Sequence, residues 1–403
     1  MLLGFLKDRD ASVAPLLALL ALPLLGSVGA AVDFSRANSA RAAMQAALDS
    51  TALMLAKESV NPDPQKGTSY FEALFARPEV QGLNVTTSAQ PGMNGTTVSM
   101  SATGSIRTQF MQVMGFGSLA LSVHSVVVAM SDGLGCVLSL NPTASGAITS
   151  QGSSSANLDG CALYDNSNNG TALTNGGSAT ISALFVGVVG GVSSSSGITA
   201  TQGIRTGIGP VADPYADVSF PNFSGCSQTN YTAKTVETIN PGVYCGGIGV
   251  NANAVLTLNS GIYYLDGGTF SVNGGATVQG QGVTLVFTKK TRKDYATASI
   301  NGSANINLTA MTSGPTAGIV IFGDRGIPAG TSFKFNGGAS QYLGGAIYVP
   351  TGAISFSGGA GTGTSCTQVI GDTVTFTGNS TVKIDCSHYE TKPFSAKVLR
   401  LAS

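Results

Sequence analysis

Cysteine is the residue type in this 403-residue chain whose chemistry is easiest to interpret. Six cysteines are present, none of them in the first 135 residues, and no two form a Cys-x-x-Cys pair. With only two histidines in the chain, the spacing predicts no metal site. An even number of well-separated cysteines favours disulfide bonds in a chain with an export signal, whereas buried free thiols would be the expectation for a cytoplasmic protein.

Local pairing is the simplest arrangement of these cysteines, because each has a neighbour within about 25 residues along the sequence. We therefore predict the disulfides Cys136–Cys161, Cys226–Cys245 and Cys366–Cys386. Six cysteines allow fifteen connectivities, so the spacing alone leaves other pairings open.

The remaining reactive side chains form no catalytic pattern. His124 lies in an alternating segment and His388 follows Cys386, and neither is beside a nucleophile with a recognisable partner. No Gly-x-Ser-x-Gly elbow is present. We expect no catalytic residue, no cofactor and no small-molecule substrate. The aspartates are scattered singly and are predicted to serve turns rather than catalysis or calcium binding: Asp159, Asp165, Asp213, Asp217, Asp266, Asp324 and Asp372.

The charge balance excludes one class of partner. Lysine plus arginine and aspartate plus glutamate number twenty each, so no basic surplus exists to bind nucleic acid. The densest cluster, residues 289–294, is predicted to be a solvated loop, and docking to an anionic envelope polymer is the alternative. Because the hydrophobic fraction is 43%, we expect many short strands rather than disorder.

An uncharged, mostly apolar run of 22 residues, Ala11–Val32, is long enough to span a bilayer as a helix. Its prolines, Pro15 and Pro23, are tolerated better in membrane helices than in soluble ones. Lys7 and Arg9 before it favour a cytoplasmic N-terminus. A cleaved signal peptide with a cleavage site near residues 26–30 is the alternative, although its apolar core should be shorter. Either segment would export the rest of the chain.

The helical pattern continues beyond the apolar run to Ser59 without glycine or proline. We expect Asn61-Pro62 to end it, since proline cannot continue a helix. The residues at three- to four-residue steps form one stripe of an amphipathic helix: Phe34, Ala37, Arg41, Met44, Leu48 and Leu55.

This N-terminal segment resembles that of TadE- and TadG-like Flp (Tad) pilus-assembly proteins. The resemblance covers about 45 residues and rests on an apolar run with a central proline, a Gly-x-x-Val-Asp motif, an arginine, and a Met-Gln-x-Ala-x-Asp-x-x-Ala-Leu motif. The matching positions are Pro23, Gly29, Val32, Asp33, Arg41, Met44, Gln45, Ala47, Asp49, Ala52 and Leu53. The chain departs from the family in having Asp10-Ala11 where a glycine commonly precedes the run. Gly4-Phe5 is a poor prepilin-peptidase site because Arg9 stands where Glu is expected, so we expect a retained anchor.

The resemblance implies a non-catalytic component of pilus assembly. It implies a single-pass protein of the bacterial inner membrane, with its bulk periplasmic or extracellular. Expected partners are other Tad (Flp) pilus-machine proteins, membrane lipid, and cell wall or surface material. The alternative is a secreted β-helical adhesin or carbohydrate-active protein, and a cleaved pseudopilin is a third reading.

Three regions follow: the anchor and stalk helix in residues 1–60, a small α+β unit in residues 61–131, and a Gly/Ser/Asn-rich β domain in residues 132–403. The small unit is predicted to contain the hairpin strands Gly82–Gln90 and Thr96–Gly104, a short helix over Ser105–Phe116 and a strand over Ser118–Met130. In the helix, Ile106, Phe110, Val113 and Met114 are expected to face inward.

The overall class is therefore mainly β. From Asp132 onward, short strands such as Ala254–Leu258, Val283–Phe287 and Val374–Thr377 recur between Gly, Asn and Ser corners. The spacing is too tight for helices between the strands and predicts a β-helix or solenoid. No fixed repeat length is visible, so an irregular β-sandwich is the alternative.

Overall fold

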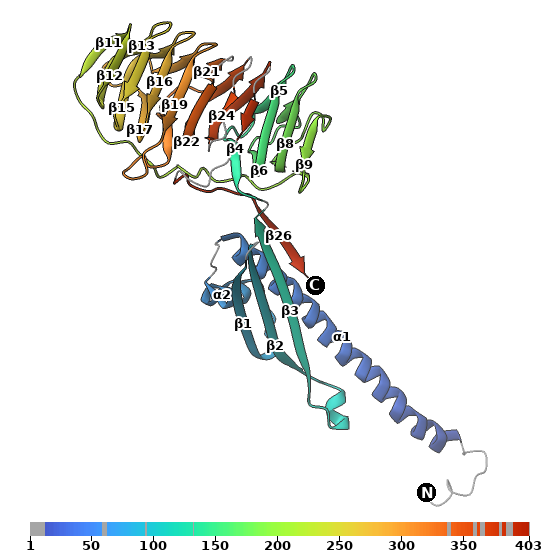
Figure 1. Cartoon of the computed structure of the whole chain (residues 1–403). Helices are drawn as coiled ribbons and strands as arrows, with labels where there is room; N and C mark the ends of the chain where they lie inside the picture. The colour runs from blue at the N-terminus through green and yellow to red at the C-terminus, as the bar shows by residue number, and fades with distance from the viewer. Residues whose placement is uncertain are drawn as a thin grey trace, which may run out of the picture. The chain divides into compact units, whose positions relative to one another are not determined.

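The structure is a computed structural model that describes residues 13–58, 63–92, 95–131, 133–336, 340–357, 361–362, 367–378, 381–383 and 390–402. Tertiary contacts divide the chain into two compact units (Figure 1). The first unit consists of Met1–Ser131 together with Lys397–Ser403, and the second of Asp132–Ala396. The second unit is therefore an insertion into the first, and the last seven residues belong to the first unit rather than to the β domain in which the sequence placed them.

The first unit packs a long helix against a four-stranded antiparallel sheet with the order β1-β2-β3-β26. Helix α1 spans Val13–Glu58, and a second helix, α2 (Pro64–Leu74), was not predicted. The strands are β1 (Val80–Gly92), β2 (Gly95–Arg107), β3 (Ser118–Ser131) and β26 (Lys397–Ala402). Strands β1, β2 and β3 confirm the predicted hairpin and third strand.

The predicted stripe of α1 supplies four of the eight described α1 residues that are buried in this unit's core. Ala37, Met44, Leu48 and Leu55 are buried against the sheet, whereas Phe34 is 50% exposed. On the sheet side the buried residues include Val98, Met100, Ala102, Leu121, Val123 and Val127. An alternating strand face and a 3.6-residue helical stripe thus meet as the sequence pattern indicates.

The predicted helix over Ser105–Phe116 is wrong. Strand β2 continues to Arg107, whose partner in β3 is Ser118, and only the single 3₁₀ turn η2 (Met111–Met114) follows. Ile106 is buried, as a residue of β2, but the side chains of Phe110, Val113 and Met114 are 50%, 89% and 50% exposed rather than facing inward. Backbone pairing with β3 overrides the local helical pattern, and Gly115, with φ 90°, ends the turn in a left-handed conformation.

The second unit is a β-helix-like solenoid, as predicted, because every pairing in its 22-stranded sheet is parallel. The alternative, an irregular β-sandwich, is therefore wrong. Its first strands are β4 (Gly135–Ser139), β5 (Ile148–Gln151), β6 (Ser155–Asp165), β7 (Leu173–Asn175), β8 (Thr180–Val188), β9 (Ile198–Ala200) and β10 (Ile204–Thr206).

The later strands form the rest of the solenoid. They are β11 (Gln228–Ala233), β12 (Val236–Ile239), β13 (Gly242–Val250), β14 (Val255–Leu258), β15 (Gly261–Val272), β16 (Thr277–Gly280), β17 (Val283–Thr288), β18 (Thr297–Ile300), β19 (Asn305–Thr309), β20 (Ile319–Gly323), β21 (Ser332–Asn336), β22 (Ser340–Ser357), β23 (Gly361–Thr362), β24 (Thr367–Thr377) and β25 (Thr381–Lys383).

Equivalent residues of successive rungs stack inside the solenoid. Phe335, Phe356 and Phe376 are register partners in neighbouring strands, with ring centroids 5.1 and 5.6 Å apart. Parallel strands about 4.8 Å apart place identical side-chain types in contact, so each rung buries the apolar face of the next.

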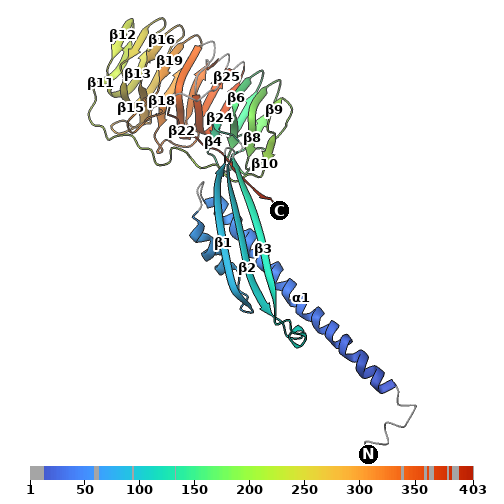
Figure 2. The same ribbon diagram turned by 60° about the horizontal axis from the view of Figure 1, so that its bottom comes forward.

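The order of the rungs does not follow the order of the sequence. The chain enters the solenoid at β4, which pairs with β24, and β6 pairs with β25. Strands β4–β10 lead to one end of the stack, and β11 begins at the other end (Figures 1 and 2). The rungs from β11 to β25 then return to the entry point, where Gly135 N–H donates to the Phe394 carbonyl over 2.7 Å.

Residues 207–227, which we call the strap, connect the two ends of the stack. Tyr215 in the strap is buried and its hydroxyl donates to Gln368 Oε1 over 2.9 Å. Arg325 Nη1 donates to the Val218 carbonyl over 2.8 Å. A hydrophobic cluster separate from the solenoid interior packs here, including Leu138, Tyr164, Phe185, Val211, Tyr215, Phe322, Tyr348 and Phe394.

Candidate functional site

The four polar residues of the family motif lie on α1, and three of them, Asp33, Arg41 and Gln45, attach this helix to the sheet or to the loop between β2 and β3. Asp33 is buried, and its carboxylate accepts three backbone hydrogen bonds from that loop. Gln109 N–H donates to Oδ1 over 2.9 Å, and Phe110 and Met111 N–H donate to Oδ2 over 2.9 and 2.8 Å. The carboxylate thereby satisfies donors that would otherwise be unpaired near the apolar end of the helix.

The other motif residues act further along the same helix. Gln45 Nε2 donates to the His124 carbonyl of β3 and to Asp49 Oδ1, both over 2.8 Å. Arg41 Nη2 lies 3.5 Å from the Ala120 carbonyl of β3. The His124 side chain itself is exposed. Arg41 and Gln45 thus fix the rotation of α1 against β3 through two backbone carbonyls of that strand. These contacts hold the helix in place on the sheet.

Close approach of the loop to α1 depends on glycine. A Cβ atom placed on Gly29 would lie 2.5 Å from Phe110 Cβ, so no larger residue fits without displacing the loop. Gly26 faces Met114, whose sulfur would lie 3.7 Å from such an atom. Sequence reasoning assigned Gly29 to the family motif and the membrane anchor but did not identify the loop that it accommodates.

The predicted membrane anchor coincides with the N-terminal part of α1. Ala11 lies outside the described residues, Pro15 and Pro23 are within the helix, and Val32 is 42% exposed. The described part from Leu19 to Lys57 is long and apolar enough to cross a membrane, by length and composition. Its apolar side chains point away from the protein, since Leu19, Leu25 and Val28 are 75%, 72% and 61% exposed.

Two of the predicted disulfides are present. Cys136–Cys161 joins β4 to β6, and Cys226–Cys245 joins the strap to β13. Cys366 and Cys386 lie outside the described residues. Because Cys226 ends the strap just before β11, the second disulfide fixes the strap to the terminal rungs of the solenoid.

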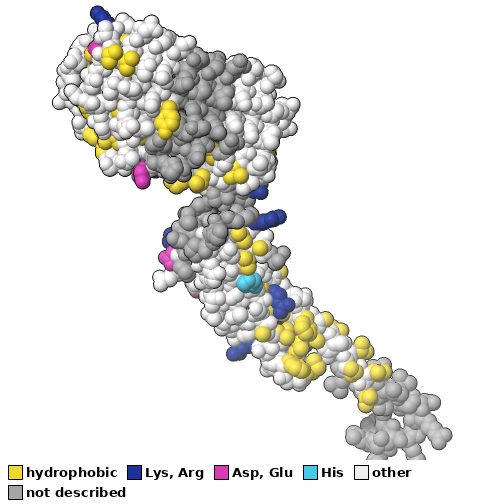
Figure 3. Space-filling model, in the orientation of Figure 1, with side chains coloured by type: hydrophobic (Ala, Val, Ile, Leu, Met, Phe, Trp, Pro, Cys, Tyr) yellow, Lys and Arg dark blue, Asp and Glu magenta, His cyan; other side chains and the backbone are white. Residues whose placement is uncertain are grey.

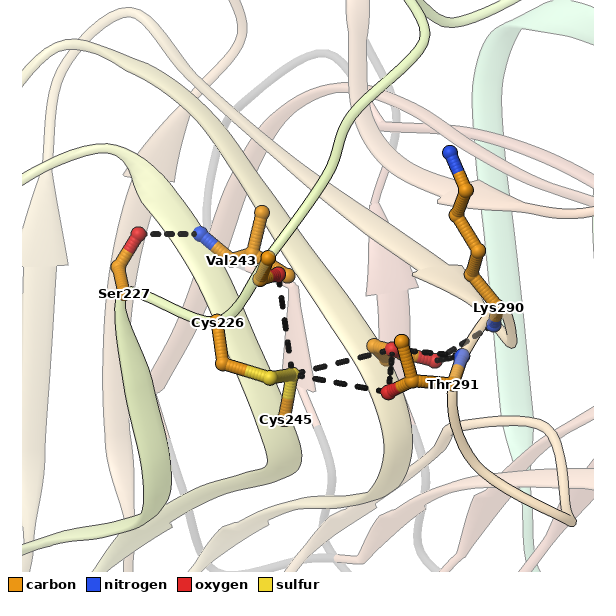
Figure 4. Close-up of a disulfide and its surroundings, with 8 residues drawn as sticks. Cys226, Ser227, Val243, Cys245, Lys290 and Thr291 are labelled. Carbon is orange, nitrogen blue, oxygen red and sulfur yellow. Dashed lines mark hydrogen bonds between the residues drawn. A yellow bond between two sulfur atoms is a disulfide. The ribbon is translucent and has the colours of Figure 1, made fainter.

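The surroundings of Cys245 are polar (Figure 4). Asp266 Oδ2 lies 3.8 Å from its sulfur, and Thr291 Oγ1 lies 3.9 Å away. Asp266 accepts the backbone N–H groups of Lys290 and Thr291 over 2.6 and 3.1 Å. Burial raises the pKa of this carboxyl, but the hydrogen bonds from Thr291 and Lys290 outweigh burial and leave the pKa below its ordinary value. The carboxylate shapes the exposed loop over residues 289–294, as expected for aspartates that serve turns.

Three other aspartates singled out from the sequence, Asp165, Asp213 and Asp372, also have structural partners, whereas the side chain of Asp159 lies outside the described residues. Asp165 is buried and accepts Ser167 N–H over 2.9 Å and Ile148 N–H over 3.1 Å. Asp213 Oδ2 accepts the Tyr348 hydroxyl over 2.8 Å, and Asp372 Oδ1 accepts the Asn141 amide over 2.9 Å. Among the residues that the structure describes, no group of three or more His, Cys, Asp or Glu side chains could hold a metal ion.

These features define a class of protein in which a long, externally apolar helix is fixed to a small sheet that carries an inserted solenoid. Residues 11–56 match the family model described as Tad, putative Flp pilus-assembly TadE/G-like. The TadE/G-like N-terminal segment predicted by resemblance is confirmed, and the match supports a part in Flp pilus assembly. Searches of curated proteins and of solved structures return no match.

Proposed function

We propose that this protein is a non-catalytic, single-pass component of Flp (Tad) pilus assembly that is anchored in the bacterial inner membrane and displays its solenoid outside the cytoplasm. The observation that carries the proposal is the coincidence of the TadE/G-like segment, residues 11–56, with α1. This is the helix whose N-terminal leucines are exposed. Exposed leucine in a charge-free helical segment favours a lipid environment.

Two further features support this location and role. The disulfides Cys136–Cys161 and Cys226–Cys245 are typical of an oxidising compartment, which favours export of the solenoid. The buried aspartates Asp165 and Asp266 of the solenoid accept hydrogen bonds from donors of their own unit, which suits a scaffold. We propose that the solenoid contacts other pilus-machine proteins, cell wall or surface material, and that lipid surrounds the first part of α1.

Carbonate extraction of membranes from the native host tests the anchor. We expect the full chain to stay in the membrane pellet with an intact N-terminus. A Leu20→Asp, Leu24→Asp double variant should be released, because each charge at the centre of a membrane helix costs about 2.5–3.5 kcal/mol. A matched variant, Val236→Asp, changes an exposed residue of β12 and should stay in the pellet.

Topology and function are tested in the same strains. Protease added to intact spheroplasts should degrade the solenoid, and deletion of the gene should reduce the number of surface pili. A carbonate-soluble chain with a cleaved N-terminus, or normal piliation without the gene, would contradict the proposal and favour a secreted β-helical protein.

A further inference from the structure

The loop between β2 and β3, residues 108–117, exposes an unusual density of apolar side chains. Phe110, Val113, Met114 and Phe116 are 50%, 89%, 50% and 59% exposed, and no residue of the loop is charged. Hydrophobic side chains also gather along the N-terminal half of α1 (Figure 3). The loop and this part of the helix belong to the same unit. An exposed apolar patch of this kind marks a binding surface.

The position of the loop along α1 sets its depth relative to the apolar run. Phe110 packs on Gly29 and Met114 on Gly26, both within the uncharged run Ala11–Val32. At about 1.5 Å of rise per residue, Gly26 lies about 9 Å before Val32, the last residue of that run. The tip of the loop is therefore level with the last two turns of the run, and if the run lies in a bilayer, the tip does too.

The backbone of the loop suits a medium without water, in which each unpaired polar group is costly. Asp33 accepts the N–H groups of Gln109, Phe110 and Met111. The loop satisfies further donors itself, because Val113 N–H donates to Phe110 O, Gly115 N–H to Gln112 O, and Phe116 N–H to Met111 O. Thr108 closes the loop, since its N–H donates to Gly117 O and its hydroxyl to Phe116 O.

We propose that the β2–β3 loop inserts into the bilayer beside α1, as a second membrane contact that does not span the membrane. Its apolar tip meets the acyl chains, and Arg107 at the base of the loop and Arg36 on α1, whose guanidinium lies 3.9 Å from Asp33, are placed to meet anionic headgroups. The inference rests on the proposed membrane anchor and goes beyond it. A lone helix can rotate and tilt in the membrane, whereas a helix with a wedge on one side has a fixed orientation.

Tryptophan fluorescence tests the insertion directly, because the chain contains no tryptophan. Three single-tryptophan variants of the full chain are reconstituted in vesicles of phosphatidylcholine and phosphatidylglycerol, with and without brominated acyl chains. Val113→Trp reports on the loop, and the high exposure of Val113 makes the change compatible with folding. Leu20→Trp reports on the anchor, and Leu74→Trp on an exposed position of α2.

We expect brominated lipid to quench Val113→Trp and Leu20→Trp but not Leu74→Trp, and we expect the emission of Val113→Trp to shift to shorter wavelength. Quenching of Val113→Trp by aqueous acrylamide but not by brominated lipid, with Leu20→Trp still quenched by lipid, would overturn the loop insertion and leave the anchor intact. Protection of Val113→Trp from both quenchers would also overturn it, because a second copy or another protein would then cover the loop. If Leu20→Trp is not quenched by lipid, the proposed anchor itself is wrong.

Discussion

Asp33 illustrates how a single polar residue can join two distant parts of the chain. It follows directly after the apolar run, and its three backbone partners lie 76 to 78 residues later. The motif Gly29-x-x-Val32-Asp33 therefore combines two local requirements, a glycine that admits the loop and a carboxylate that binds the loop's backbone. The resemblance predicted the importance of these residues, but their partner could not be predicted, because nothing near them in the sequence identifies it.

Replacement of Asp33 by alanine should loosen the β2–β3 loop. Amide hydrogens of Gln109, Phe110 and Met111 should exchange about tenfold faster or more, since each would lose a hydrogen bond to a charged acceptor. Asp49→Ala is the matched control, because Asp49 bonds to Gln45 on the same helix and not to the loop. Unchanged exchange in Asp33→Ala would show that packing against Gly29 alone holds the loop.

Asp165 should make the stability of the solenoid depend on pH. Burial raises its pKa from the ordinary value of 3.8 to about 6, against the opposing effect of hydrogen bonds from Ser167 and Ile148. A carboxyl whose pKa is raised by folding stabilises the protein below pH 3.8, and this contribution is lost as the pH rises through 6. The gap between the two values corresponds to about 3 kcal/mol.

The measurement is the melting temperature of wild type and Asp165→Asn between pH 4 and pH 7. The wild type should lose stability across this interval relative to the variant. Burial also raises the pKa of Asp372, so both proteins will show some dependence on pH and only their difference reports on Asp165. Parallel curves for the two proteins would show that Asp165 does not titrate in this range.

Among the structural elements, the strands of the solenoid bend at glycines that adopt a left-handed backbone conformation. Gly268 has φ 76°, and a Cβ atom there would lie 2.2 Å from the backbone of Gly246 in the neighbouring rung. Gly160 has the same φ, but a Cβ atom there would have no neighbour within 4 Å. The two positions therefore separate the cost of the backbone conformation from the cost of crowding.

We predict that Gly160→Ala lowers the free energy of unfolding of the solenoid by about 1–2 kcal/mol, the cost of a left-handed conformation. Gly268→Ala should cost about 1–3 kcal/mol more, because the backbone of the adjacent rung must also move. Urea unfolding of the full chain, followed by circular dichroism, measures both. Equal effects of the two substitutions would contradict the role of inter-rung crowding at Gly268.

Element type was predictable where the local pattern and the tertiary structure agree. Alternation in Thr96–Gly104 and Ser118–Met130 predicted β2 and β3, because one face of each strand packs on α1. The segment between them was misassigned as a helix, since the exposed side chains of Phe110 and Val113 at helical spacing imitate a buried stripe. Strand β13 was missed because Gly246 and Gly247 interrupt its apolar pattern at a bulge.

In the molecule as a whole, the solenoid is inserted between two adjacent strands of the first unit. Ser131 at the end of β3 is the register partner of Lys397 at the start of β26. A short turn can therefore join the two strands as an ordinary hairpin. We predict that replacing residues 133–396 by a short Gly/Asn-rich linker leaves the first unit folded and in the membrane.

Hydrogen exchange of the shortened protein in detergent would check this prediction. Amides of β2 and β3 should keep the protection they have in the full chain, and a Gln45→Ala variant of the shortened protein should lose part of it. Collapse of protection throughout β1–β3 would show that the sheet depends on the inserted unit.

The order of the rungs could not be read from the sequence. Short, closely spaced strands and Gly/Asn/Ser corners predicted the solenoid, but β4 stacks on β24, more than 200 residues away, and no repeat length identifies that neighbour. The apolar residues of the strap follow no strand or helix period, and its role follows only from contacts such as Tyr215 with Gln368 and Arg325 with Val218. Long-range closure of this kind depends on which rung ends are complementary, and local patterns do not encode that.

The antiparallel pairing of β3 with β26 also determines how the protein would respond to mechanical force. A load applied to the solenoid reaches the first unit through two chain segments, one at Ser131 and one at Lys397. These two residues form the first of the six register pairs between β3 and β26. Both segments are pulled in the same direction, so the load does not draw β3 and β26 apart. Detachment of β26 would leave β3 joined to the solenoid through Ser131, and the load would then rest on the strand that pairs with β2 along almost its whole length and packs on α1.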